Sequence, residues 1–196
     1  MSQSVIDAAV SAPAAQIVSV PVGNACCDLL GLFAGVPDGR VGQGRDHPVA
    51  AVLALAAAAV VAGMKGYTAI TGWIADVPPA ILADLYLRSG AAPAPPPSKT
   101  TIWRVLTDAG TDAFDAAVGT WLMDLAGFTT PAAAGEEDCS RPLMQVRLDG
   151  KARIMAGLRN LAIGALRMAG RADITEATRW AGRSMDRLFT ILGLTS

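Results

Sequence analysis

The sequence has little of the side-chain chemistry on which most enzymes depend. It contains one histidine and three cysteines in 196 residues. Cys26 and Cys27 are adjacent and Cys139 is far from both, so there is no Cys-x-x-Cys pair and no even set at disulfide spacing. We therefore expect a reducing compartment and no metal site built on cysteine. His47 has no partner at metal-ligand spacing and precedes Pro48, which favours a helix-start residue over the alternative of a catalytic base.

Basic residues are missing from the start of the chain, and no apolar run is long. The first Lys or Arg is Arg40, so the basic region that opens a secretory signal peptide is absent. The longest apolar run, Val49–Met64, is rich in alanine and falls short of the roughly 20 residues that a membrane-spanning helix needs. It predicts a buried core helix and no membrane partner.

Charge is distributed unevenly along the chain. Residues 1–140 hold six Lys or Arg against thirteen Asp or Glu, a net charge of −7, whereas residues 141–196 hold ten against four, a net charge of +6. The overall charge of −1 hides this polarity. A basic C-terminal part indicates a polyanionic partner, with a solvated helix face as the bland alternative.

Apolar residues that recur at helical spacing between proline- and glycine-containing breaks predict a mainly α fold. We expect a loose N-terminus (1–24), a helical domain (25–128), a linker (129–145) rich in Pro, Gly and acidic residues, and a separate C-terminal part (146–196). Within the C-terminal part, Asp173 and Glu176 have the spacing of a capping box at the start of a helix.

The short helices expected between Tyr67 and Thr107 resemble a helix-turn-helix in size, and Ser98–Leu106 is the candidate recognition helix. Ser98 is its expected N-cap, and Ile102, Val105 and Leu106 are expected to face the core. The outward residues are then candidates for DNA binding, although plain helix packing explains the same pattern. They are Lys99, Thr100, Trp103 and Arg104.

The spacing of apolar residues changes from that of a strand to that of a helix within the stretch from Val146 to Met168. Val146, Leu148 and Asp149 alternate as in a strand, and Gly150-Lys151 predicts a turn. A helical pattern then follows. One side is expected to carry Ile154, Leu158, Leu161, Ala165 and Met168, and the other Arg153, Gly157, Asn160, Gly164 and Arg167.

Basic residues from this stretch onward make up the second candidate surface. Arg153, Arg167 and Arg171 are further candidates for DNA binding. A row of arginines at intervals of four residues follows them, at Arg179, Arg183 and Arg187, where Gly182 and Ser184 predict a helix break.

Several of these segments, in the same order, resemble the H-repeat-associated family of DDE-type insertion-sequence transposases. The motifs stand here as Asp38-Gly39-Arg40, Asp46-His47-Pro48, Gly63-Met64, Trp73 and Pro97-Ser98-Lys99-Thr100-Thr101-Ile102-Trp103-Arg104, within about residues 28–125. Gly39 replaces the proline of the family's Asp-Pro-Arg, and Asp46 replaces the arginine of its Arg-His-Pro. Leu148-Asp149-Gly150-Lys151 is similar to the first catalytic motif, and the C-terminal helices are similar to the family's extreme C-terminus.

The resemblance implies a bacterial, cytoplasmic protein of a mobile element, in which Asp149 occupies the position of the first of three catalytic acids. Intact relatives use Mg²⁺ with those acids. The segment that would supply the second Asp and the Glu is absent between Lys151 and Ala152, where an RNase H-like core needs on the order of a hundred residues. The resemblance therefore implies a truncated transposase that binds no metal and has no catalytic activity.

Two functions from different classes remain open on the sequence. The first is DNA binding at insertion-sequence ends without catalysis, with an intact transposase relative as a further partner. The second is a helical interaction module that dimerises through apolar faces left uncovered by the missing core.

Overall fold

The computed structural model describes residues 28–40, 45–127 and 150–194, and within these ranges the regular elements are nine helices and no strand. The predicted mainly α fold is confirmed. The expected strand at 146–149, with Asp149, lies outside the described residues, as do the N-terminal residues 1–24 and the linker 129–145. The helices are α1 (Leu29–Ala34), α2 (Val49–Val61), α3 (Tyr67–Ala75), α4 (Pro79–Arg88), α5 (Lys99–Asp108), α6 (Thr111–Leu125), α7 (Gly150–Met168), α8 (Ile174–Ala181) and α9 (Met185–Ile191).

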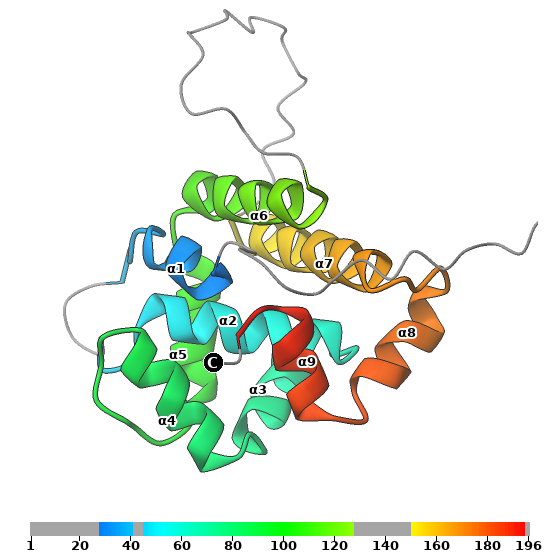
Figure 1. Ribbon diagram of the computed structural model, residues 1–196. Coiled ribbons are helices and arrows are strands. Elements are labelled where there is room, and N and C mark those ends of the chain that lie inside the picture. The colour runs from blue at the N-terminus through cyan, green and yellow to red at the C-terminus, as the bar shows by residue number, and fades with distance from the viewer. Residues whose placement is uncertain (1–27, 41–44, 128–149, 195–196) are drawn as a thin grey trace, which may run out of the picture.

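Helix α2 lies at the centre of the molecule, and all of its residues are buried. A helix that is apolar on every side must be covered on every side, and α1, α3, α5, α7 and α9 supply that cover (Figure 1). Alanine makes up much of its surface, which lets neighbouring helices approach closely. The predicted core helix is thus confirmed, and no described helix has the length and apolar character required to span a bilayer.

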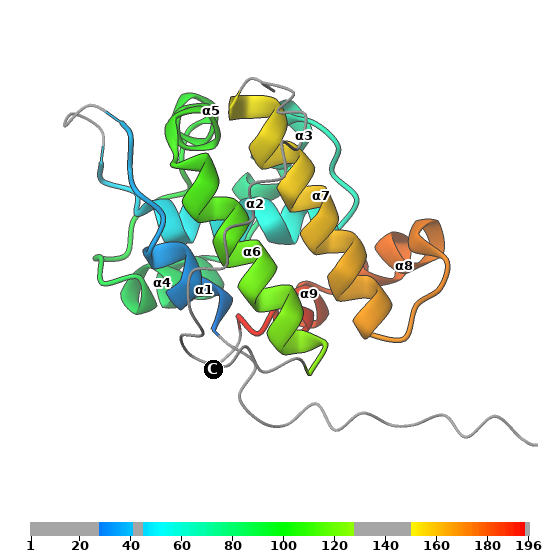
Figure 2. The ribbon, with the colours of Figure 1, turned by 90° about the horizontal axis from the view of Figure 1, so that it is seen from above.

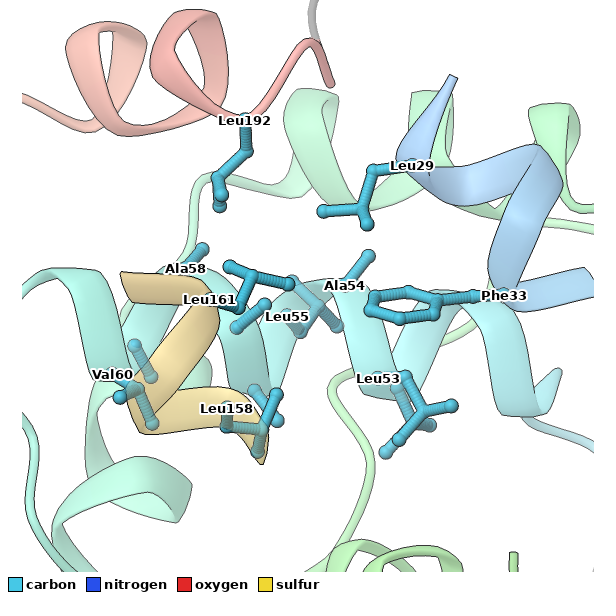
Figure 3. Packing of buried hydrophobic residues seen from close by; sticks show 14 of the residues in the cluster. Leu29, Phe33, Leu53, Ala54, Leu55, Ala58, Val60, Leu158, Leu161 and Leu192 are labelled. Carbon is cyan, nitrogen blue, oxygen red and sulfur yellow. The ribbon is translucent and has the colours of Figure 1, made fainter. Parts of the chain in front are cut away.

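The C-terminal helices share this core with the N-terminal ones. Figure 3 shows Leu29 and Phe33 of α1, Leu158 and Leu161 of α7, and Leu192 gathered around α2. All five side chains are inaccessible to solvent. One core therefore spans both sides of the expected linker, while the division into separately folding domains stays a prediction.

Helices α6 and α7 lie side by side, and two glycines of α7 make this possible (Figure 2). A Cβ on Gly157 would come within 2.6 Å of Phe114 Cε1, and one on Gly164 within 2.4 Å of Leu122 Cδ2. These glycines were expected on the side of α7 away from the core, so that expectation is wrong. It overlooked α6 as a second partner for the helix.

Two further expectations about α7 are corrected. Gly150 and Lys151 belong to its first turn and do not form a separate turn. Met168, expected among the core residues, is the last residue of α7 and is 43% exposed. The predicted core residues Ile154, Leu158, Leu161 and Ala165 are all fully buried, as expected.

A polar contact joins the two ends of the described chain. Arg88, in the last turn of α4, donates hydrogen bonds to the Leu194 carbonyl and to Asp28. Asp28 is also the N-cap of α1. Arg88 thus links Leu194, at the C-terminal end of the described chain, to the N-cap of α1.

Candidate nucleic-acid interface

Helix α5 exposes the four side chains that the sequence singled out for DNA. Ser98 caps the helix by accepting a hydrogen bond from the Thr101 amide at 3.2 Å, and the core residues Ile102, Val105 and Leu106 are fully buried. Their burial fixes the rotation of the helix about its axis. The side that remains in solvent carries Lys99, Thr100, Trp103 and Arg104.

Lys99 and Arg104 have no carboxylate partner among the described residues. Trp103 is 41% exposed, which is unusual for a large aromatic residue. The acid on the same helix, Asp108, lies in its last turn and is also exposed. The solvent side of α5 therefore combines two cations, a hydroxyl and an indole, the side-chain types that contact phosphates and bases.

The segment that connects α4 to α5 is longer than the turn of a helix-turn-helix. A turn of three to four residues joins the helices of that motif. Here residues 89–98, which include the proline-rich stretch, separate α4 from α5, and α5 packs on α2, α3 and α7. The short connection is instead between α3 and α4. A recognition role for α5 stays a prediction that rests on its exposed residues.

Arg153 has two acidic partners on α6. Its guanidinium lies 2.6 Å from Asp115 and 2.7 Å from Asp112. The hydrogen bond to Asp115 is the main reason that the pKa of Arg153 is raised above its ordinary value. DNA would have to compete with two carboxylates for this side chain, so Arg153 is the weakest of the predicted DNA-binding residues.

Arg167 and Arg171 are in a different electrostatic setting. Arg167 is exposed in the last turn of α7, and the Arg171 guanidinium lies 4.1 Å from the ring centroid of Trp180 on α8. Arg187 of α9 lies over the same ring at 4.2 Å. Within the described ranges, none of these arginines is ion-paired. Trp180 was not predicted, because no local pattern indicates that the turn before α8 and helix α9 each bring an arginine to its ring.

The two candidate surfaces lie at opposite ends of α7. Figure 2 shows α5 beside the first turns of this helix and α8 beside its C-terminal part. A helix of 19 residues is about 28 Å long at 1.5 Å per residue. The structure thus brings Arg171 together with Trp180 and Arg187 at the end of α7 that carries Arg167, and keeps them apart from Lys99 and Arg104.

The segment that precedes α2 holds a polar cluster that sequence reasoning missed. Arg40 is 4% exposed and binds Asp38 through two hydrogen bonds, Nε to Oδ1 at 2.9 Å and Nη2 to Oδ2 at 2.8 Å. It also donates to the His47 carbonyl at 2.8 Å. The hydrogen bond from Arg40 lowers the pKa of the Asp38 carboxyl. The two-residue spacing of Asp and Arg was the available signal.

His47 and Tyr86 belong to the same cluster. The Nδ1 atom of His47 lies 2.5 Å from the Tyr86 hydroxyl. Burial lowers the pKa of His47 and raises the pKa of Tyr86 to about 12. The contact with Tyr86 and the hydrogen bond from Arg40 to its carbonyl give His47 structural partners at the start of α2, in keeping with the interpretation of His47 as a helix-start residue.

Gly39 shows why this chain departs from the Asp-Pro-Arg pattern. Asp38 forms an isolated β-bridge with Ala109, and a Cβ on Gly39 would lie 2.0 Å from the Asp108 carbonyl oxygen. A residue with a side chain fits there only if the backbone moves. The glycine lets the segment pack directly against the end of α5.

The described residues contain no group of three or more His, Cys, Asp or Glu side chains that could hold a metal ion. Asp149, the acid that the resemblance singled out, lies outside the described residues.

Comparison with known proteins gives one match. Residues 30–122 match a family model described as DDE_Tnp_1-associated. The match includes the Asp38–Arg40 cluster, the central helix and α5. No curated protein and no solved structure matches the chain significantly.

Proposed function

Residues 30–122 belong to the DDE_Tnp_1-associated family, and on that premise we propose that this chain, related to insertion-sequence transposases, binds DNA and does not catalyse transposition. The observation that carries the proposal is the solvent side of α5, where Lys99, Thr100 and Arg104 are exposed inside the matched segment. Intact relatives of the H-repeat-associated type supply the expected target, the ends of the element.

The reason for expecting no catalysis is the number of acids. Two-metal phosphoryl transfer needs several carboxylates that hold two ions about 3.5–4 Å apart. The resemblance assigns one such acid, Asp149, and no described cluster supplies others. A chain that binds element ends without cutting them would compete with an active transposase for the same sites.

DNA binding is tested with the full chain and two fluorescent duplexes, one containing the ends of the element and one of random sequence. We expect tighter binding to the end duplex. The double variant Lys99→Ala with Arg104→Ala should lose that preference, because the two cations are the charged groups on the solvent side of α5. Lys65→Ala with Arg159→Ala is the matched control, since it removes one exposed Lys and one exposed Arg from other surfaces.

Equal affinity of the unaltered chain for both duplexes, unchanged by the α5 substitutions, would overturn end recognition. Catalysis is tested in the same samples with Mg²⁺ or Mn²⁺. We expect no strand cleavage, and cleavage that disappears in Asp149→Ala would overturn the second half of the proposal.

The alternative is an interaction module. This alternative was based on apolar faces left uncovered by the missing core. The structure weakens that basis, because the apolar side of α7 is buried in the core of the same chain. A shallow groove of about 380 Å³ between α6 and α7 is the observation that still favours it, with Val118, Leu122 and Ala156 among its lining residues. Sedimentation equilibrium without DNA distinguishes the two: a stable dimer supports the module.

A further inference from the structure

Trp180 holds two arginines that come from different parts of the chain. Asp173 caps α8 by accepting hydrogen bonds from the amides of Thr175 and Glu176, and Ala177 and Ala181 turn one side of the helix into the core. Trp180 is left partly exposed. The guanidinium groups of Arg171 and Arg187 lie 4.1 and 4.2 Å from its ring centroid, within the range of a cation–π interaction.

The backbone conformation before Arg171 and a side-chain hydrogen bond of Arg187 hold the two arginines in place. Gly170 has φ +77° and ends α7, and the Arg171 amide donates to the Leu166 carbonyl, which sets the direction of the chain as it leaves the helix. Arg187 Nη1 donates to the Trp180 carbonyl at 2.6 Å. A guanidinium has five N–H donors, so most of those on Arg187 remain available to a ligand.

No carboxylate among the described residues neutralises this pair. The acids on the same elements are Asp173, Glu176 and Asp186, and none of them forms an ion pair with any described arginine. Both guanidiniums lie within 4.2 Å of one centroid, so they are separated by at most twice that distance. Two like charges this close repel each other, and an anion beside them is stabilised by both.

We infer that Trp180 positions Arg171 and Arg187 as a site for the phosphate backbone of duplex DNA. The same and adjoining segments also carry the exposed Arg167, Arg179 and Arg183. This inference rests on the proposed function and adds to it a second DNA contact, at the far end of α7 from α5. Contacts of guanidinium groups to phosphates carry no sequence information. The site therefore supplies affinity that falls with salt, and α5 supplies the preference for one sequence.

The test is the salt dependence of DNA binding by the full chain. Each phosphate neutralised contributes about 0.9 to the slope of log affinity against log salt concentration. Arg171→Gln with Arg187→Gln should reduce the slope by about two and weaken binding about tenfold at 150 mM salt, for end and random duplexes alike. Arg45→Gln with Arg88→Gln is the matched control, because it removes two arginines that already have carboxylate partners and that were not proposed to bind DNA. We expect the control to change affinity by less than about twofold.

Two substitutions of Trp180 test the positioning role itself. Trp180→Phe keeps an aromatic ring under the arginines and should keep the slope, whereas Trp180→Leu removes it and should lower the slope with all charges unchanged. Circular dichroism checks that Trp180→Leu is folded. If it is not, the double arginine variant decides alone.

The outcomes separate this inference from the proposed function. A chain that binds neither duplex at low salt overturns both. A chain that prefers the end duplex, with a slope that Arg171→Gln and Arg187→Gln do not change relative to the control, overturns the phosphate site and leaves the α5 proposal standing. Equal slopes for Trp180→Phe and folded Trp180→Leu would overturn the positioning role of the indole.

Discussion

Most arginines are used differently in the two halves of the described chain. In the N-terminal half, Arg40, Arg45 and Arg88 each form an ion pair with a carboxylate, and Arg104 on α5 is the described arginine there that does not. In the C-terminal half, Arg153 is paired and the remaining described arginines are not. A count of charge along the sequence is therefore a poor guide to the charge available for a ligand.

Burial distinguishes one paired arginine, Arg40, from the unpaired ones. Arg40 is almost fully buried with both edges of its guanidinium engaged, whereas Arg179 and Arg183 are exposed. A buried charge needs its partner because desolvation is otherwise uncompensated. An exposed one contributes little to stability and is available to a polyanion. The two groups therefore respond differently to substitution.

The largest effect is expected from removing the C-terminal half. A chain ending at residue 149 loses the fully buried Ile154, Leu158, Leu161 and Phe189 and uncovers one side of α2. Each large apolar side chain contributes about 1.5–3 kcal/mol when buried. Their sum is comparable with the roughly 5–15 kcal/mol that holds a typical domain folded. We expect no cooperative thermal transition by circular dichroism.

The opposite result would be just as informative. A shortened chain that melts cooperatively at the temperature of the full one would mean that residues 28–127 fold independently. It would support the domain boundary that the sequence predicts at the linker.

The next largest effect is expected at Arg40. Arg40→Gln leaves the Asp38 carboxylate partly buried without its bidentate partner, a change that costs about 3 kcal/mol in comparable pairs. Arg183→Gln in the unpaired group should stay within about 0.5 kcal/mol of the unaltered chain. Urea unfolding of the two variants measures both values. Equal destabilisation would remove the distinction between paired and unpaired arginines.

A smaller effect is expected at the contact between α6 and α7, where the one paired C-terminal arginine among the described residues lies. Gly157→Ala places a methyl group against the Phe114 ring, and overpacking of this kind costs about 1–3 kcal/mol. Gly119→Ala on α6 is the control, because no described atom lies within 4 Å of the place its methyl group would take, and alanine is favoured in helices by up to about 1 kcal/mol. If Gly157→Ala is as stable as Gly119→Ala, the two helices are not packed as closely as the structure shows.

Local patterns were sufficient to predict much of the fold. The buried stripe of α5 and the caps Ser98 and Asp173 follow from residues close in sequence. The apolar run that forms α2 predicted burial on every side. Side-chain periodicity and capping depend on neighbours a few residues away, so one sequence is enough to read them.

Contacts between distant segments were not predictable in the same way. Arg153 is 38 residues from Asp115, and nothing near either residue indicates that they meet. Gly157 and Gly164 were placed on a solvent side because their contacts with α6 exist only after folding. Trp180 and its two arginines come from three segments of the fold. The candidate surfaces could therefore be proposed from the sequence, but their electrostatic setting could not.

The smallest effect is expected from pH, and it should come from the paired half alone. Burial holds the pKa of His47 below its ordinary value of 6.5. Above pH 6.5 the histidine is neutral in both the folded and the unfolded chain, so the free energy of unfolding is at its full value. As pH falls below 6.5, the unfolded chain takes up a proton that the folded chain does not, and stability declines until pH reaches the lowered pKa.

The same reasoning predicts a second pH range, at high pH, in which the free energy of unfolding falls. The pKa of Tyr86 is raised from 10.0 to about 12, so the unfolded chain releases its phenol proton first and stability falls as pH rises through this interval. Urea unfolding between about pH 5 and 7 and between about pH 9 and 12 should show both declines. His47→Gln should flatten the acid side and Tyr86→Phe the alkaline side.

Arginine keeps its charge throughout these pH ranges, so Arg171→Gln with Arg187→Gln should leave both declines unchanged. This variant is therefore the control from the unpaired half of the chain. A pH profile altered by the Trp180 arginines but not by His47→Gln would mean that the titrating groups that govern stability lie in the C-terminal half. The exposed arginines would then contribute to the free energy of unfolding as much as the buried Arg40, and the proposed difference between the two groups would be wrong.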